Sequence, residues 1–178
     1  PNSPSLNYLV QDFVNNVQET LDTKPEDAND TEWFDLIDAK RIYRKEALEF
    51  VNFANTVGND TKSKYPCLWL SAAAMGNYLL GNQQQAMNEA AQAINANGTP
   101  RMRDNARAIR MLITTRNSQL DDNYTAYLLG ELRWLDSKIK TERHNPSVYD
   151  NHYSDVKDRV IHKGIEPLFA KSGKPLVA

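Results

Sequence analysis

The sequence predicts an all-α fold of about seven helices arranged as a stack of helical hairpins. Seven glycines and eight prolines are few for 178 residues, whereas residues that favour helices are plentiful. No segment shows the two-residue alternation of apolar and polar side chains that is typical of a strand. Apolar residues recur instead every three or four positions. At this length we expect one domain, residues 1–178.

The stretch from Pro66 to Asn117 shows the helical pattern most clearly. Short turns rich in Gly, Asn and Pro divide it into three apolar-periodic segments, which predict helices over about 64–80, 83–95 and 100–117. Asn82 and Gln85 have the spacing of a capping box at the start of the second helix, and Thr99-Pro100 is expected to cap the third. Small residues mark the expected helix contacts: Ala72, Ala73, Ala74, Ala86, Ala90 and Ala93.

Four more helices are expected outside this stretch. Two lie at about 5–22 and 31–57, and the sixth begins at Asp121 or Asp122 and buries Leu128. Gly130, inside the sixth helix, is expected to permit a close helix crossing. The seventh helix is defined by Tyr149, Tyr153, Val156 and Val160. Pro167 should end or kink it and leave an irregular tail.

Residues 66–97 resemble one tetratricopeptide helix-turn-helix unit. Ala74 or Gly76 supplies the small residue of the first helix, Gly81-Asn82 forms the turn, and alanines 86, 90 and 93 mark the second helix. The pattern does not recur one repeat length upstream or downstream, so the resemblance covers a single unit.

This resemblance implies that the first helix of the pair lines a concave groove. The matching positions carry apolar or neutral side chains, unlike the basic and Asn residues with which some relatives hold a peptide carboxylate. The expected ligand is therefore an apolar or amphipathic segment. The groove residues are Leu68, Ser71, Met75, Tyr78 and Leu79.

Charged residues form two further candidates. Arg103, Arg107 and Arg110 recur at steps of four and three, which predicts a basic stripe that binds an acidic partner or is simply a solvated helix face. Between Glu19 and Asp38, eight acidic residues stand against Lys24 alone. The order Asp27, Asn29, Thr31 is partly similar to a calcium loop, but Glu32 occupies the position that needs glycine, so a favourable helix dipole is the preferred interpretation.

Several classes of function are not expected. The net charge of −2 argues against nucleic acid and anionic membranes as partners, and no apolar run is long enough to span a bilayer. The three histidines lack metal-ligand spacing, and no catalytic motif or nucleotide loop is present, so we expect no metal, cofactor or enzymatic activity. Cys67 is expected to be a buried thiol that packs as a small apolar side chain.

The expected function is a non-enzymatic module that binds a protein or peptide, or acts as a scaffold, through the apolar groove. The alternative is an architectural helical domain of a larger protein, exported bacterial proteins included, with no ligand of its own. Because the chain begins at Pro1 without methionine, we expect it to be part of a longer protein. The sequence does not indicate its cellular location.

Overall fold

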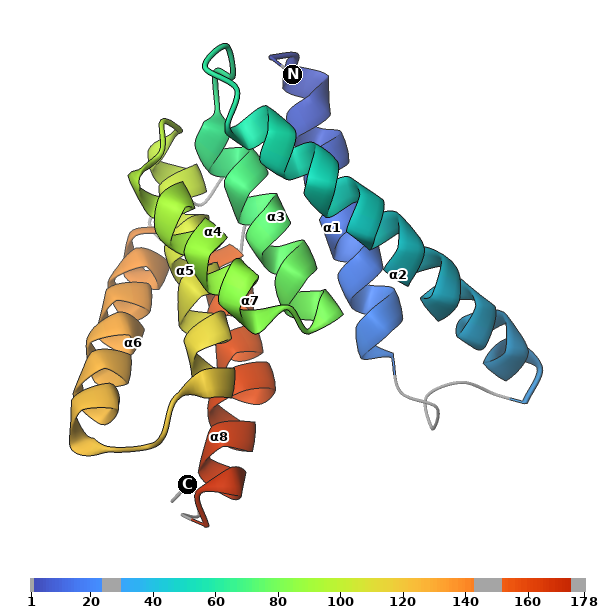
Figure 1. Ribbon diagram of the computed structural model, residues 1–178. Coiled ribbons are helices and arrows are strands. Elements are labelled where there is room, and N and C mark those ends of the chain that lie inside the picture. Colours follow the sequence, from blue (N-terminus) through green and yellow to red (C-terminus); the bar gives the residue numbers. More distant parts are fainter. Residues whose placement is uncertain (1, 24–29, 143–151, 174–178) are drawn as a thin grey trace. The chain divides into compact units, whose positions relative to one another are not determined.

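The computed structural model describes residues 2–23, 30–142 and 152–173, with the backbone alone for residues 30–35. The all-α prediction is confirmed, because these residues form helices joined by short connections and include no strand (Figure 1). The helices belong to two compact units, Pro1–Ile109 and Arg110–Ala178. The expected single domain stays a prediction.

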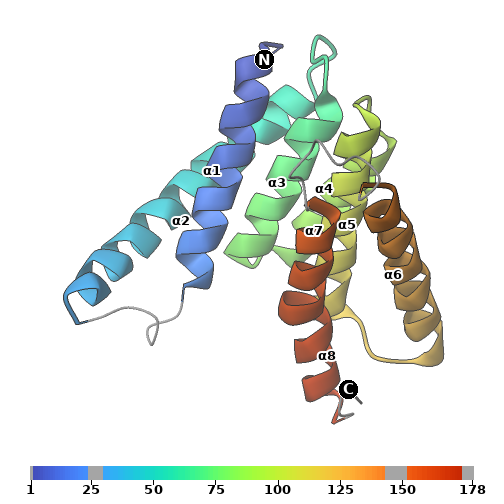
Figure 2. The same cartoon turned by 180° about the vertical axis from the view of Figure 1, so that it is seen from behind.

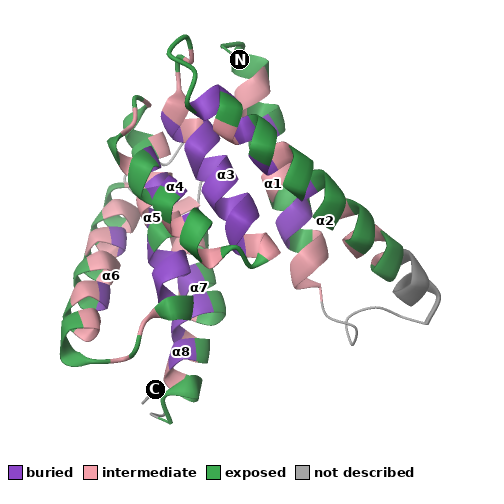
Figure 3. Ribbon diagram, viewed as in Figure 1, coloured by how far each residue is buried: buried purple, intermediate pink, exposed green. Residues whose placement is uncertain are grey.

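The first unit contains α1 (Pro4–Asp22), α2 (Asp30–Gly58), α3 (Pro66–Leu80), α4 (Gln83–Asn95) and the first half of α5 (Pro100–Asn117). All five helices lie within two residues of their predicted bounds. In this unit α3 packs against α1, α2 and α4. Every residue from Trp69 to Tyr78 is buried, which makes α3 the central helix of the unit (Figure 3).

Small residues allow the helices of the first unit to approach closely. A Cβ atom added to Gly76 of α3 would lie only 2.6 Å from Cγ2 of Val51 on α2. The alanines of α4 that were expected at helix contacts, Ala86, Ala90 and Ala93, are fully buried. The short side chains therefore lie where the axes come together, as predicted.

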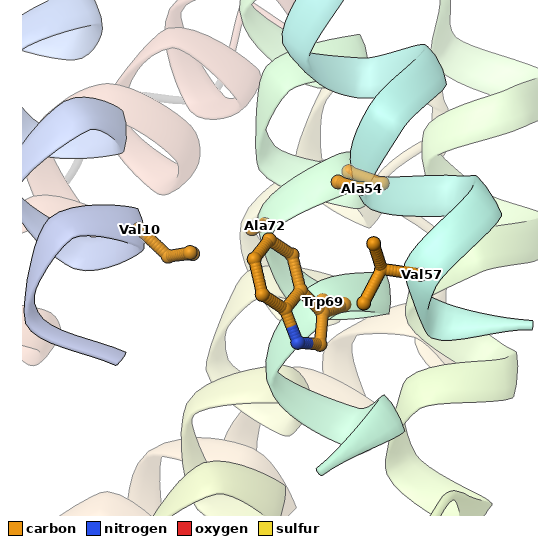
Figure 4. Packing of buried hydrophobic residues seen from close by; sticks show 6 residues of the cluster. Val10, Ala54, Val57, Trp69 and Ala72 are labelled. Carbon is orange, nitrogen blue, oxygen red and sulfur yellow. The ribbon is translucent and has the colours of Figure 1, made fainter. Parts of the chain in front are cut away.

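Two apolar clusters lie on either side of α3. In the first, Trp69 lies between Val10 of α1 and Ala54 and Val57 of α2 (Figure 4). In the second, Cys67 and Leu70 of α3 pack with residues of α4 and α5, namely Ala93, Ala106 and Met102. The prediction that Cys67 is a buried thiol is confirmed.

The helix starts agree only in part with the sequence signals. The Thr99 hydroxyl accepts the Met102 N–H at 3.2 Å, as expected for a cap. The predicted capping box at α4 is wrong, because Asn82 makes no side-chain cap bond. The side-chain amides of Asn82 and Gln85 donate instead to Asn77 and Glu89, which draws both away from the helix end.

The second unit contains the remainder of α5, then α6 (Asp122–Glu142), α7 (His152–Val160), a π-helical turn η2 (Ile161–Ile165) and α8 (Glu166–Lys171). The Asp121 carboxylate accepts the Tyr124 N–H at 2.7 Å and caps α6. Leu128 is buried, as predicted. Gly130 is exposed, and a Cβ atom added to it would meet nothing within 4 Å, so the expected close crossing is wrong.

The chain also does not become irregular at Pro167. The segments α7, η2 and α8 follow one another directly, and Pro167 lies in the first turn of α8, where a missing N–H costs little. In the π turn, the Glu166 N–H donates to the Ile161 carbonyl, five residues back. Tyr149, the first residue of the predicted seventh helix, lies outside the described residues.

Gly164→Ala should destabilise the protein. The π turn places Gly164 against α5, and an added Cβ would lie 2.5 Å from Oγ1 of Thr115, whose hydroxyl already donates to the Leu112 carbonyl at 2.6 Å. Overpacking of this kind costs about 1–3 kcal/mol. Gly130→Ala is the matched control and should stabilise by up to about 1 kcal/mol, since alanine favours an exposed helix interior. Equal effects of the two substitutions in denaturant unfolding would contradict the close approach.

Candidate functional site

The first candidate is a buried carboxylate, that of Glu89 on α4, which is only 1% exposed. Asn55 of α2 donates to its Oε1 at 2.5 Å, and Asn77 of α3 donates to Oε1 at 3.0 Å and to Oε2 at 2.8 Å. Gln85 donates to Oε1 at 3.0 Å, and the Asn77 oxygen accepts from Asn82 at 2.9 Å. We call these five residues the amide cluster.

The amide cluster joins three helices at one carboxylate. A charge taken from water costs several kcal/mol unless hydrogen bonds compensate it, and here the donors are neutral amides that approach both oxygens. Because its oxygens already accept bonds from α2, α3 and α4, Glu89 is suited to holding the helices in register. The cluster therefore has the geometry of a structural clamp.

The sequence contained a signal for the amide cluster that the apolar pattern concealed. Glu89 lies three residues after Ala86 and directly before Ala90, on the face that the alanines mark as buried. Asn77 likewise interrupts an apolar helix. A carboxylate and an amide on two faces predicted to pack together would have indicated a buried polar contact.

The predicted groove residues are mostly in the interior. Ser71, Met75 and Tyr78 are buried, whereas Leu68 and Leu79 are half-buried. The three buried side chains offer no exposed surface to a ligand in this structure. The groove stays a prediction.

The predicted basic stripe has varied surroundings. Arg103 belongs to the first unit, is exposed, and donates to the Gly98 carbonyl at 2.6 Å. Arg107 is half-buried. Arg110 belongs to the second unit, where burial and the Glu131 charge raise the pKa of Tyr127 and the Arg110 charge partly opposes them. The stripe also stays a prediction.

The acidic segment and the histidines add no ligand site within the described part. Asp27 and Asn29 lie outside it, as do the side chains of Thr31 and Glu32. No group of three or more potential metal ligands occurs among the described residues. In the same part of the chain, no helix is both long and apolar enough to cross a membrane.

The second candidate is an exposed apolar face on α1 and α2. The sequence did not distinguish its side chains from those of the core. Phe13 of α1 packs against Phe50 of α2 with ring centroids 4.6 Å apart. Leu9, one turn before Phe13, is 61% exposed, and Phe53, one turn after Phe50, is 55% exposed. On the α2 side, Ile42 is 46% exposed. We call Leu9, Phe13, Ile42, Phe50 and Phe53 the α1–α2 face.

The α1–α2 face is fixed to the core of the first unit. The Phe53 ring contacts buried Trp69 edge-on, with centroids 5.6 Å apart, so an exposed side chain lies directly on the central helix. At the other end, the Lys40 ammonium donates to the Thr23 carbonyl at 2.5 Å and links α2 to the end of α1. The two helices thus present a surface held at both ends.

No family model matches this sequence, and neither does any curated protein or solved structure.

Glu89→Gln should destabilise the protein although it preserves the side chain's shape. An amide has one oxygen where the carboxylate has two. With that oxygen at the Oε1 position, the buried Asn77 amide would lose its 2.8 Å bond to Oε2 and face an N–H group there; with the oxygen at the Oε2 position, Asn55 and Gln85 would lose their acceptor. Leaving a buried polar group without a hydrogen-bond partner costs about 1–3 kcal/mol. Gln85→Ala removes an exposed donor and should cost less than about 1 kcal/mol. If urea unfolding shows that Glu89→Gln lowers the unfolding free energy no more than Gln85→Ala does, the structural role of the amide cluster is contradicted.

The pH dependence of stability tests the burial of Cys67. Burial raises the pKa of its thiol, with smaller opposing effects from the Ser71 hydroxyl and the Arg103 charge. A raised pKa in the folded state stabilises the fold below the unfolded pKa, about 8.5, and this contribution is lost as the pH rises towards the folded value.

The difference in unfolding free energy between the native protein and Cys67→Ala should therefore be constant up to about pH 8 and shrink above it. Comparison with the variant cancels the titration of tyrosines and lysines. A difference that stays constant up to about pH 10 would contradict the raised pKa.

Proposed function

We propose that this protein is a non-enzymatic helical module that binds a segment of another protein through the α1–α2 face. One observation carries the proposal: Leu9 and Phe53, both more than half exposed, each lie one helical turn from the Phe13–Phe50 contact that joins α1 to α2. Single exposed apolar side chains are ordinary, but several of them gathered around the contact between two packed helices form a patch, and such patches are typical of interaction sites.

The packing of the first unit supports this function. The α1–α2 face lies on α3, whose residues from Trp69 to Tyr78 are all buried. The amide cluster links α2 to α3 and α4. A surface that is already in place loses little conformational entropy when a partner docks, which favours affinity.

We further propose that α3 and α4 are an irregular relative of a tetratricopeptide unit. The left-handed Gly81, with a φ angle of 88°, and the fully buried alanines of α4 support this relationship. The amide cluster is not part of the tetratricopeptide pattern that residues 66–97 resemble. In this proposal the binding surface moves from the first helix of the pair to the helices that precede it.

The architectural alternative is favoured by the length of α2. Its N-terminal half runs past the end of α3 in both views (Figures 1 and 2), and Ile37 on that half is 47% exposed. Further helices of a parent chain could cover this half. In that case the module would have no separate ligand.

Peptide selection with matched variants tests the proposal. A library of helical peptides is selected on the native protein, and the enriched peptides are measured against Leu9→Glu/Phe53→Glu. We expect at least about a tenfold loss of affinity, or about 1.4 kcal/mol. The control is Tyr8→Glu/Leu48→Glu, which also replaces exposed apolar residues of α1 and α2, 82% and 52% exposed, on other faces of the two helices.

Two results would contradict the proposal. Peptides whose affinity both double variants reduce equally would show that the α1–α2 face is not the binding surface. Self-association of the native protein that Leu9→Glu/Phe53→Glu abolishes, with no peptide enriched, would favour the architectural alternative.

A further inference from the structure

We propose that the partner of the α1–α2 face is a basic amphipathic helix, with apolar residues on one side and Lys or Arg along the borders of that side. This inference rests on the proposed function and identifies the partner's chemistry. It follows from the charges that surround and interrupt the face.

The α1 side of the face carries acidic residues and no basic ones. Between Pro4 and Asp22 the helix contains Asp12, Glu19 and Asp22 but neither Lys nor Arg. Asp12 is exposed and lies three residues after Leu9, close to one helical turn. Its carboxylate accepts a long bond of 3.4 Å from the neutral Asn16 amide. The border along α1 is therefore negative.

On α2, acidic and apolar side chains share one stripe. Ile42, Glu46, Glu49 and Phe53 follow one another at steps of four, three and four, which places them on the same side of a helix. Glu46 and Glu49 are both exposed. The two carboxylates thus lie between the two exposed apolar anchors of the stripe.

Most basic residues of α2 lie away from the stripe. At about 100° per residue, Arg41 and Arg44 are rotated by more than 100° from its centre, whereas Lys45 lies at its edge, four residues before Glu49. Arg41 is also paired with Asp38 at 3.2 Å. With Lys45 alone at its edge against Glu46 and Glu49, the stripe keeps an excess of negative charge that a basic partner can meet.

The dimensions of the stripe fit a helix. The interval from Ile42 to Phe53 corresponds to about 16 Å at 1.5 Å per residue, or about three turns of a partner helix. Apolar side chains at spacings of three and four on such a helix can meet the apolar anchors, as in other helix-in-groove complexes. Lys or Arg on its flanks would meet Asp12, Glu46 and Glu49.

The same charges disfavour other occupants. An anionic membrane or a nucleic acid would be repelled by the acidic border. A second copy that docks the same face across a two-fold axis would bring the acidic borders of both copies together. A basic helix is the occupant for which both the apolar and the charged parts of the surface are complementary.

Three synthetic helices of about 18 residues test the inference against the full chain. They share one apolar face and carry Lys, Gln or Glu at every flanking position. By titration calorimetry we expect the affinity order Lys, Gln, Glu, with at least about a tenfold range, and binding of the Lys peptide should weaken as salt rises from about 50 to about 500 mM.

Neutral variants localise the effect. Asp12→Asn/Glu46→Gln/Glu49→Gln should reduce the range among the peptides to less than about threefold while the thermal midpoint stays close to the native value. The control, Asp122→Asn/Asp155→Asn/Asp158→Asn, makes the same change in charge on exposed residues of the second unit. This control variant should preserve the affinity order of the three peptides.

The outcomes separate this inference from the proposed function. Equal binding of the three peptides, abolished by Leu9→Glu/Phe53→Glu, would overturn the basic partner and leave the binding face standing. Binding of none of them would contradict both. Binding to anionic lipid vesicles in preference to the Lys peptide, or a stable dimer blocked by Leu9→Glu/Phe53→Glu, would also overturn the basic helix.

Discussion

The buried carboxylate of Glu89 is the interaction on which the packing of α2, α3 and α4 depends. Many of the buried residues between these helices are alanine and glycine, which permit close approach but interlock less than larger side chains do. Hydrogen bonds from Asn55 and Asn77 supply that specificity, because a shifted helix would leave the carboxylate buried without donors. The position of α2, and with it the α1–α2 face, follows from this contact.

The helices themselves could be predicted from the sequence because the signals that define them are local. Apolar spacing and turn residues placed the first five helices within two residues of their bounds. The errors arose where another partner or a local irregularity overrides the helix signal. Glu89, four residues after Gln85, and Asn77, five residues before Asn82, draw these two amides away from the capping box. A π turn carries the last helix through Pro167.

The exposed surface was harder to predict, because apolar periodicity identifies a face without identifying what covers it. Leu9 and Phe53 are apolar residues at helical spacing and remain exposed, whereas Met75 and Tyr78, which the family resemblance assigned to a groove, are buried. Whether an apolar residue faces solvent depends on which helices pack against its own. That arrangement is set by contacts between distant parts of the chain, so no single segment of the sequence specifies it.

Chemical-shift mapping of the isotope-labelled protein with the Lys-flanked helix tests most directly whether the first unit, held together by the amide cluster, presents a binding face. We expect the largest changes at Leu9, Phe13, Ile42 and Phe53, with the side-chain amide signals of Asn55 and Asn77 unchanged, because docking should leave the amide cluster intact. Changes centred on Leu68, Met75 and Tyr78, or loss of the two amide signals on binding, would contradict this and show that the first unit opens to admit its partner.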